Sequence, residues 1–389
     1  MSFRDENRRN FNSIAVSSSL KGFFDSIPNT ILTPYLYDLG ASFTLLGSFR
    51  ALPSMISLIS SRFWGAISDS MERRKPFILL SFLLSIPFFL AYAFIADSPR
   101  DFLIIRVISS FFSLEAGILP ATIASTSTRL GRAFGDYSFA TSAAWTSGGM
   151  FSGWFVEHYS INAAFLLGSL GTIIASTIFL FTYQEVGERK VHRIDPRKIV
   201  LKTISFDLNP KAWKLTILSV FTALRSAFFG LPAVMKMYIL LGRSKTIYTI
   251  VLSFAGLAGI ITSPLYGRAV DRFGARKSAI TSLSAYMIYL PLMALTNSPF
   301  LFAVLWAIPI GNLEYAALMS LKVKVSNPKG RATDIGTIQA ISSLFAALGN
   351  VAAGALVDHL DIASSLFIAT LFDVMALILM LRMSDFVIR

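Results

Sequence analysis

The sequence predicts an all-α integral membrane protein with twelve transmembrane helices arranged as two six-helix repeats. Apolar residues make up 54% of the 389 residues and charged residues only 15%, so a soluble domain would have more apolar surface than it could bury. Apolar stretches of about 20 residues, the length that crosses about 30 Å of hydrocarbon, recur along the chain. A short polar motif occurs twice, with its aspartates, Asp69 and Asp271, at corresponding places in the two halves, which indicates a duplication.

The apolar stretches number twelve and are separated by short polar breaks. They lie near 13–37, 43–66, 76–96, 101–124, 134–157, 161–183, 213–238, 246–266, 278–296, 299–321, 335–357 and 362–382. The single long polar interval, residues 184–212, divides six stretches from six. We therefore predict an N-terminal half over 1–183, a cytoplasmic linker over 184–212 and a C-terminal half over 213–389.

The distribution of lysine and arginine predicts the orientation of the chain. With the N-terminus inside, the cytoplasmic segments hold 27 of the 35 basic residues, the outer segments four and the predicted helices the remaining four. This positive-inside pattern places both termini and the linker in the cytoplasm. The net charge of +13 is concentrated in those loops, which favours contact with an anionic lipid bilayer and argues against a nucleic-acid partner. We predict a multi-pass monomer in the cytoplasmic membrane.

The repeated polar motif combines a glycine, an aspartate four residues later and basic residues within six positions of that aspartate. Its members are Gly65, Asp69, Arg73 and Arg74 in the first copy and Gly267, Asp271, Gly274 and Arg276 in the second. Glycine lets helix ends approach closely, and the aspartate can accept hydrogen bonds from a helix N-terminus or an arginine. Both copies resemble the signature loops of the major facilitator superfamily, although Glu72 replaces a usual glycine and Ala275 a usual basic residue.

That resemblance implies a twelve-helix secondary transporter that works by alternating access, with the two motifs as gating loops on the cytoplasmic side. Further internal matches support the repeat. Glu115 precedes Arg132 by the same interval as Glu314 precedes Arg331. In a second match, Gly153 and Glu157 of the first half correspond to Gly354 and Asp358 of the second. Two halves of the same orientation are expected of parallel repeats around an axis normal to the membrane.

No enzyme signature is present in the sequence. The chain has no His-Glu-x-x-His, no Gly-x-Ser-x-Gly and no phosphate-binding Gly-x-x-x-x-Gly-Lys-Ser/Thr motif. It has no cysteine, and its three histidines fall near predicted loops. We therefore expect no enzymatic activity, no cofactor and no metal site, and transport driven by an ion or substrate gradient.

Charged residues inside the predicted helices are the candidate functional residues, because each is costly in hydrocarbon unless it faces protein or water. They are Lys21, Arg50, Arg106, Arg225, Asp25, Glu115, Glu314 and Asp373. Their formal charges sum to zero, which permits complete internal pairing. All except Asp373 enter the predicted substrate and proton site.

Lys21 and Arg225 occupy matching places, each seven residues before a proline, Pro28 and Pro232. This basic pair is similar to the anion-binding arrangement of the organophosphate/phosphate antiporters of the same superfamily. In the superfamily, the first, fourth, seventh and tenth helices line the central cavity, and these helices carry Lys21, Glu115, Arg225 and Glu314. The resemblance implies that one base and one acid from each half face the substrate.

The charged residues also have structural interpretations. The four residues could form two structural ion pairs that fix helix packing or close a gate. Asp25 could also pair locally with Lys21, four residues earlier on the same helical face. Arg106 resembles the fourth-helix arginine of the family's second motif, or it could extend to the nearby outer surface. Arg106 and Glu115 are nine residues apart, on opposite faces of an ideal helix, so both reach one cavity only if the helix bends.

The leading functional hypothesis is proton-coupled transport of a small polar or charged organic solute, with Glu115, Glu314 and Asp25 as candidate proton carriers. The expected partners are this small-molecule substrate, protons and the lipid bilayer. One alternative is exchange of organic or inorganic anions on Lys21 and Arg225. An alternative of another class is a membrane sensor or lipid-handling protein without transport activity.

Overall fold

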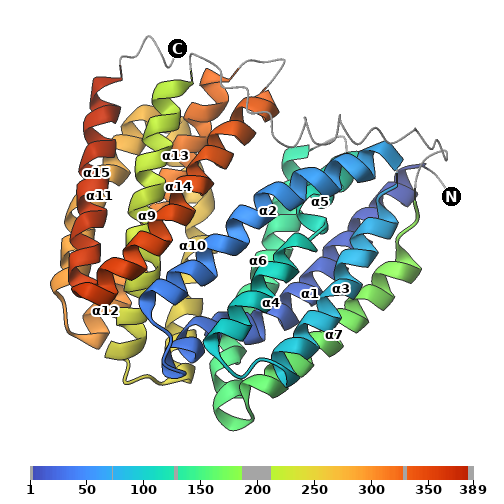
Figure 1. The fold of residues 1–389 in the computed structure, drawn as a ribbon. Helices are drawn as coiled ribbons and strands as arrows, with labels where there is room; N and C mark the ends of the chain where they lie inside the picture. The colour runs from blue at the N-terminus through green and yellow to red at the C-terminus, as the bar shows by residue number, and fades with distance from the viewer. Residues whose placement is uncertain (1–2, 72, 127–129, 186–211, 327–330, 384–389) are drawn as a thin grey trace. The chain divides into compact units, whose positions relative to one another are not determined.

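The computed structural model describes residues 3–71, 73–126, 130–185, 212–326 and 331–383, and most of them are helical. Figure 1 shows the helices in order along the chain. The helices are α1 (Phe3–Asp38), α2 (Phe43–Met71), α3 (Lys75–Phe94), α4 (Pro99–Phe111), α5 (Glu115–Thr126), α6 (Leu130–His158), α7 (Ile161–Thr182), α9 (Trp213–Leu240), α10 (Lys245–Phe273), α11 (Ala275–Leu295), α12 (Pro299–Trp306), α13 (Ile310–Val325), α14 (Arg331–His359) and α15 (Ile362–Arg382). The predicted linker lies outside the described residues, except for 184, 185 and 212.

Two compact units repeat the same helix packing. Unit 1 comprises Met1–Leu39, Ile56–Ser205 and Lys245–Ser253, and unit 2 comprises Gly40–Met55, Phe206–Ser244 and Phe254–Arg389. In unit 1, α1 packs against α6 and α7, and α3 packs against α7. In unit 2, α9 packs against α14 and α15, and α11 packs against α15. The second set of contacts matches the first helix for helix, which confirms the predicted internal repeat.

Local sequence signals place the helix ends at corresponding points of the repeat. Gly40 follows α1 and Gly242 follows α9, both with positive φ, 85° and 67°, a conformation that favours glycine. Ser98 caps α4 and Ser298 caps α12, each accepting a hydrogen bond from a backbone N–H three residues later. Small and polar residues at these four positions therefore turn the chain where the apolar stretches end.

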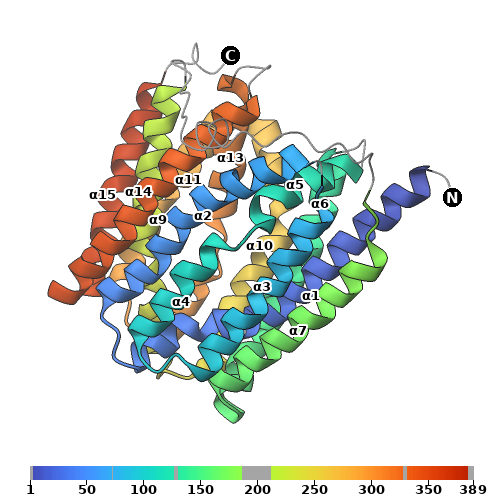
Figure 2. The ribbon, with the colours of Figure 1, turned by 45° about the vertical axis from the view of Figure 1, so that its right-hand side comes forward.

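The predicted fourth and tenth transmembrane stretches are each divided into two helices, which corrects the single helices expected over 101–124 and 299–321. Figure 2 shows the interruption between α4 and α5. Side chains of α2 compensate for this break, since Ser60 and the Trp64 indole both donate to the carbonyl of Phe111. The second break falls at Pro309, which precedes α13 and cannot donate a helical hydrogen bond.

The two copies of the polar motif are also more helical than predicted. Gly65 and Asp69 lie within α2, and Gly267 and Asp271 lie within α10, so these residues do not belong to loops. The helices end only two residues after each aspartate. A helix keeps its own backbone hydrogen bonds after it leaves the membrane, so an apolar stretch underestimates helix length.

Close helix contacts at glycine and acidic helix caps explain why Gly153 and Glu157 match Gly354 and Asp358 in the internal repeat. A Cβ on Gly153 would lie 2.2 Å from a carbonyl oxygen of the first residue of α10, and one on Gly354 would lie 2.2 Å from that of α2. Four residues on, Glu157 accepts a hydrogen bond from the N–H of Thr246 at 3.0 Å. Asp358 accepts equivalent bonds from the start of α2, at 2.7 and 2.8 Å. Each acid therefore caps a helix N-terminus that its glycine allows to approach.

The helices have the length and composition of membrane spans. Within the described part of the chain, nine helical stretches are long and apolar enough to cross a bilayer. Buried apolar side chains form one cluster around Phe82, Phe179 and Ala175 in unit 1 and another around Leu283, Leu321 and Met380 in unit 2. The protein is therefore an all-α, multi-pass membrane protein.

Candidate functional site

Unit 1 contains a polar cavity of about 210 Å³ among α1, α3, α4 and α6. Its lining is Lys21, Asp25, Asn29, Leu84, Ser85, Phe88, Phe89, Tyr92, Arg106, Ser109, Phe112, Ser113 and Trp145. Three of the seven predicted substrate and proton residues, Lys21, Asp25 and Arg106, are in this set. The cavity therefore brings together charged groups from two helices, between aromatic walls.

The polar groups of the cavity are linked to one another. Lys21 Nζ donates to Asp25 Oδ2 at 2.5 Å, and each of these side chains is 13% exposed, so the predicted local pair is confirmed. Thr172 Oγ1 on α7 is 3.4 Å from the other oxygen of Asp25. Arg106 Nη1 donates to Asn29 Oδ1 at 3.0 Å, so the guanidinium turns toward α1 instead of extending to the outer surface.

Tyr92 adds a hydroxyl that makes no hydrogen bond of good geometry among the described residues, although polar groups lie next to it. The residue is 3% exposed and its ring stacks on Phe165 and Phe102, with centroids 4.8 and 5.5 Å away. The hydroxyl lies beside Arg106 and Ser109. Burial removes the hydrogen bonds of this hydroxyl to water, and its protein neighbours replace them only in part. At the cavity wall it is suited to bind a polar group of a ligand.

Unit 2 holds the corresponding cation in a closed cluster. Arg225 on α9 donates from Nη2 to Glu314 Oε2 at 2.6 Å and from Nη1 to Asp373 Oδ1 at 3.0 Å. The guanidinium carbon lies 3.8 Å from the ring centroid of Tyr286, a cation–π contact. Arg225, Glu314 and Asp373 are 4%, 5% and 0% exposed. The predicted Arg225 and Glu314 are therefore in contact, and Asp373 completes the cluster from α15.

The two remaining predicted site residues are Arg50 and Glu115. Arg50 on α2 lies beside Gly230 of α9 in unit 2, with its Nη1 3.3 Å from where a Cβ on Gly230 would be. A glycine at this point of α9 leaves room for the arginine. Glu115 is the first residue of α5, and its side chain lies outside the described residues. The helix is interrupted between Arg106 on α4 and Glu115 on α5, and a shared cavity for the two side chains remains a prediction.

The basic residues after each motif aspartate contact the end of a neighbouring helix in the same unit. Lys75 Nζ donates to the carbonyls of Leu180 and Tyr183 at the end of α7. Arg276 Nη2 donates to the carbonyl of Leu381 at the end of α15. The side chain of Asp69 lies outside the described residues.

Around these basic residues, the backbone and side chains complete the two motif copies. The backbone N–H of Arg74 donates to Glu185 at 2.9 Å, and Arg73 accepts from Ser68. In the second copy, Asp271 is exposed, and Gly274 turns the chain with a φ of 87°. The gating role of both copies remains a prediction.

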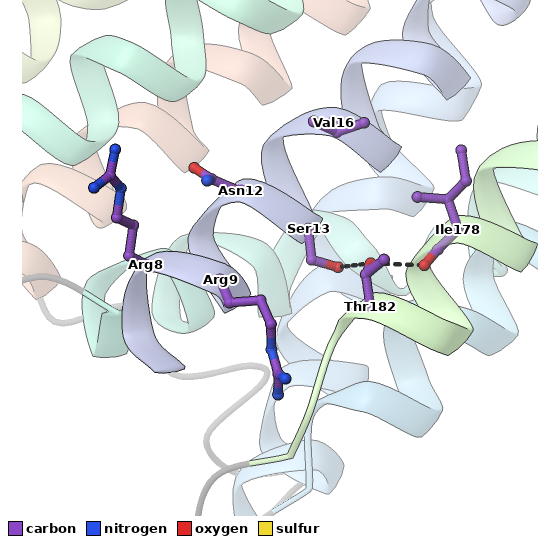
Figure 3. A pocket seen from close by; sticks show the side chains of 7 residues that line it. All are labelled: Arg8, Arg9, Asn12, Ser13, Val16, Ile178 and Thr182. Carbon is purple, nitrogen blue, oxygen red and sulfur yellow. Dashed lines mark hydrogen bonds between the residues drawn. The ribbon is translucent and has the colours of Figure 1, made fainter. Parts of the chain in front are cut away.

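A second hollow, of about 390 Å³, lies where the first turns of α1 meet the end of α7 (Figure 3). Ser13 and Thr182 form a hydrogen bond of 2.5 Å across it, and Val16 and Ile178 line one end. The guanidinium groups of Arg8 and Arg9 extend in different directions (Figure 3). Because they do not converge, this hollow is a weaker candidate site than the cavity beside Lys21.

Several residues of both clusters escaped the sequence analysis. Asn29, Tyr92 and Thr172 are uncharged and stand among many similar residues in apolar helices, so no sequence signal marks them. Tyr286 is also uncharged and lies in an apolar helix, so no sequence signal marks it either. Asp373 carried a signal as one of eight charges within the predicted helices. No group of histidine, cysteine and acidic residues suited to a metal ion occurs in the described part of the chain.

The fold defines an all-α, multi-pass membrane protein built of two helical repeats, with a polar cavity in unit 1. The chain belongs to the Major Facilitator Superfamily, whose model matches residues 14–240 and 216–385. The multidrug resistance protein MdtG of Klebsiella pneumoniae (strain 342) is 24% identical over 273 residues, 67% of this chain and 63% of that protein. MdtG of Salmonella typhi is 23% identical, over 67% and 65% of the two chains. The matched region thus spans less than two thirds of these relatives.

Solved structures show the same fold over nearly the whole chain. The nucleoside transporter NupG superposes with a TM-score of 0.78 at 14% identity, covering 96% of this chain and 99% of that chain. A POT family transporter in complex with 5-aminolevulinic acid gives 0.77 at 14% identity, with 98% and 97% coverage. The human organic anion transporter MFSD10 gives 0.69 at 15%, with 96% and 99% coverage. All three of these solved structures are of transporters.

Proposed function

We propose that the protein is a secondary active transporter that moves a small polar or charged organic solute by alternating access, coupled to protons. The observation that carries the proposal is the cavity of unit 1. There the Lys21–Asp25 pair, Arg106 and the buried hydroxyl of Tyr92 converge between aromatic walls. Charged side chains within membrane helices mark substrate or proton pathways, and a cavity supplies the polar surroundings that they need.

The size of the cavity limits the solute. Pockets that enclose drug-sized ligands measure about 300–1,000 Å³, and this cavity measures about 210 Å³. It therefore accepts a small metabolite or the polar end of a larger molecule. The similarity to MdtG supports organic compounds as solutes, and drug-like molecules belong in the test panel for that reason. In this proposal Asp25 is the proton carrier of the cavity, because it is the acid on its wall.

Anion exchange on Lys21 and Arg225 is less well supported. Arg225 already binds two carboxylates in a closed cluster, and Lys21 binds Asp25. An anionic substrate would have to displace these acids, at a large desolvation cost. We place the termini of the transporter in the cytoplasm, as the positive-inside pattern predicts.

The test combines flux and a fluorescence signal from the cavity itself. Purified protein in liposomes is given dipeptides, nucleosides, organic anions and cationic drugs, with and without an imposed pH gradient. Trp145 lines the cavity, whereas Trp154, nine residues later on the same helix, does not. A bound solute should change tryptophan fluorescence in the wild type and in Trp154→Phe, but not in Trp145→Phe.

The outcomes separate the candidate functions. Solute flux that follows the pH gradient, with a fluorescence change that depends on Trp145, supports the proposal. Flux that needs an anion on the far side and ignores the pH gradient supports anion exchange. No flux of any solute, with no fluorescence change, leaves the sensor or lipid-handling alternative.

A further inference from the structure

The arginine cluster of unit 2 contains a carboxylate oxygen without a partner. Asp373 is 0% exposed, and its Oδ1 accepts a hydrogen bond from Arg225 Nη1 at 3.0 Å. Its Oδ2 is buried and has no hydrogen-bond partner among the described residues. An ionised carboxylate with one oxygen in this state lacks the compensation that buried charges need. A protonated carboxyl bears much less charge on that oxygen.

The charges around Asp373 point in the same direction. Arg225 on α9 faces two acids, Asp373 and Glu314 on α13, so the three groups carry a net charge of −1 if both acids are ionised. Tyr286 on α11 covers the guanidinium with its ring. Lys322, two turns beyond Glu314 on α13, acts on Glu314 electrostatically, but no ion pair joins it to either acid in the described residues.

The remaining neighbour of Asp373 contributes no further charge. The α14 segment 335–357 contains no charged residue. A proton on one acid would make the three-residue group neutral. Of the two acids, Glu314 makes the shorter bond to Arg225, 2.6 Å against 3.0 Å. Short charge-assisted bonds are typical of the ionised partner, which leaves Asp373 as the acid that holds the proton.

We propose that Asp373 is a proton-binding site, protonated on Oδ2 while the cluster is closed and deprotonated when water reaches it. On release, the Oδ2–H bond breaks, its electron pair stays on the carboxylate, and the proton passes to water. Arg225 then holds two carboxylates, and water solvates the additional charge. Whether Asp373 binds a proton does not depend on the proposed function. The use of that proton as the coupling ion for transport does rest on the proposed function.

The repeat makes this site specific to unit 2. Asp373 occupies the same position relative to the first residue of α15 as Thr172 does relative to the first residue of α7. Thr172 cannot titrate in the physiological range. The same position therefore holds a proton-binding group in unit 2 and a neutral hydroxyl in unit 1.

Infrared spectroscopy tests the proton directly. Wild-type protein in liposomes at neutral pH should show the absorption of a protonated carboxyl, and labelling of aspartate with ¹³C at the side-chain carboxyl should shift it. The absorption should be lost in Asp373→Asn and retained in Asp25→Asn, the control for the aspartate in unit 1. An absorption that is missing in the wild type, or that does not shift with labelled aspartate, would overturn the assignment. This wild-type measurement stands even if a variant fails to fold.

Transport by Asp373→Asn tests the coupling. Asparagine keeps the oxygen that accepts from Arg225 and resembles the protonated acid, so the variant should exchange solute across the membrane but accumulate less of it in a pH gradient than the wild type, in which Asp25 and Asp373 both carry protons. Full pH-driven accumulation in this variant would reject the coupling role, whatever the infrared result. If the wild type moves no solute, the proposed function fails, while the infrared spectrum still decides whether Asp373 binds a proton.

Discussion

The two units place a cation at matching points of α1 and α9 but surround it differently. In unit 1, Lys21 pairs with Asp25 on the same helix, and a cavity remains beside the pair. In unit 2, the partners of Arg225 come from α13 and α15, and the ring of Tyr286 covers the guanidinium. A pair within one helix does not require neighbouring helices to close around it, whereas a three-helix cluster does. The same helix packing thus leaves a cavity beside the cation in unit 1 and forms a closed cluster of Arg225, Glu314 and Asp373, called the lock below, in unit 2.

The largest effect should come from removing both acids of the lock. Glu314→Gln combined with Asp373→Asn leaves Arg225 buried without an ionised partner, which should cost about 3–5 kcal/mol in the free energy of unfolding. Each single variant should cost far less, because the remaining acid can stay ionised beside the arginine. Thermal unfolding in detergent of the wild type, the two single variants and the double variant forms a double-mutant cycle.

The same double-mutant cycle can also contradict this prediction. If the double variant loses no more than the sum of the single variants, the two acids do not act on one cation, and unit 2 has no lock. Asp25→Asn in unit 1 is the matched comparison. It should cost less than the double variant, since Lys21 is 13% exposed beside a cavity that can admit water.

The second-largest effect is expected at a feature that the two units share, the close approach of a glycine to the start of a neighbouring helix. Gly153→Ala and Gly354→Ala each place a Cβ 2.2 Å from a backbone carbonyl oxygen, and overpacking of this kind costs about 1–3 kcal/mol. Gly135 and Gly336 lie on the same two helices, with no atom near an added Cβ. Alanine at these control positions should leave the apparent melting temperature unchanged or raise it slightly. Equal melting temperatures for Gly153→Ala and Gly135→Ala would show that the close approach to α10 is absent.

The smallest effect concerns solute affinity. Tyr92→Phe removes a hydroxyl that makes no hydrogen bond of good geometry among the described residues, so stability should change little. If the hydroxyl binds solute, affinity should fall by about 0.5–1.5 kcal/mol, the net contribution of one hydrogen bond. Tyr286→Phe in unit 2 is the control and should leave affinity unchanged. Titration of the fluorescence of Trp145 measures both, and equal affinities for the wild type and Tyr92→Phe would remove Tyr92 from the site.

The sequence by itself determined the class of protein and its internal repeat. Hydrocarbon thickness fixes the length of an apolar span, so twelve stretches of about 20 residues identify a polytopic membrane protein without knowledge of packing. The duplication is visible because matching positions keep matching residues, such as Glu157 and Asp358, whose capping roles the structure then explains. The local pair of Lys21 and Asp25 was also predictable, since a spacing of four residues puts both on one helical face.

Only the tertiary structure decided which charges meet across helices. Arg225 and Asp373 are far apart in the sequence, and their contact depends on how α9 and α15 are rotated and packed, which no local pattern encodes. The helix breaks after α4 and α12 were also not predicted. The break after α4 is stabilised by Ser60 and Trp64 of α2, which are far from it in the sequence, so the local sequence does not reveal it. The cavity beside Lys21 has the same origin. It is space that the packing of four helices leaves unfilled, and the sequence specifies the side chains but not the space between them.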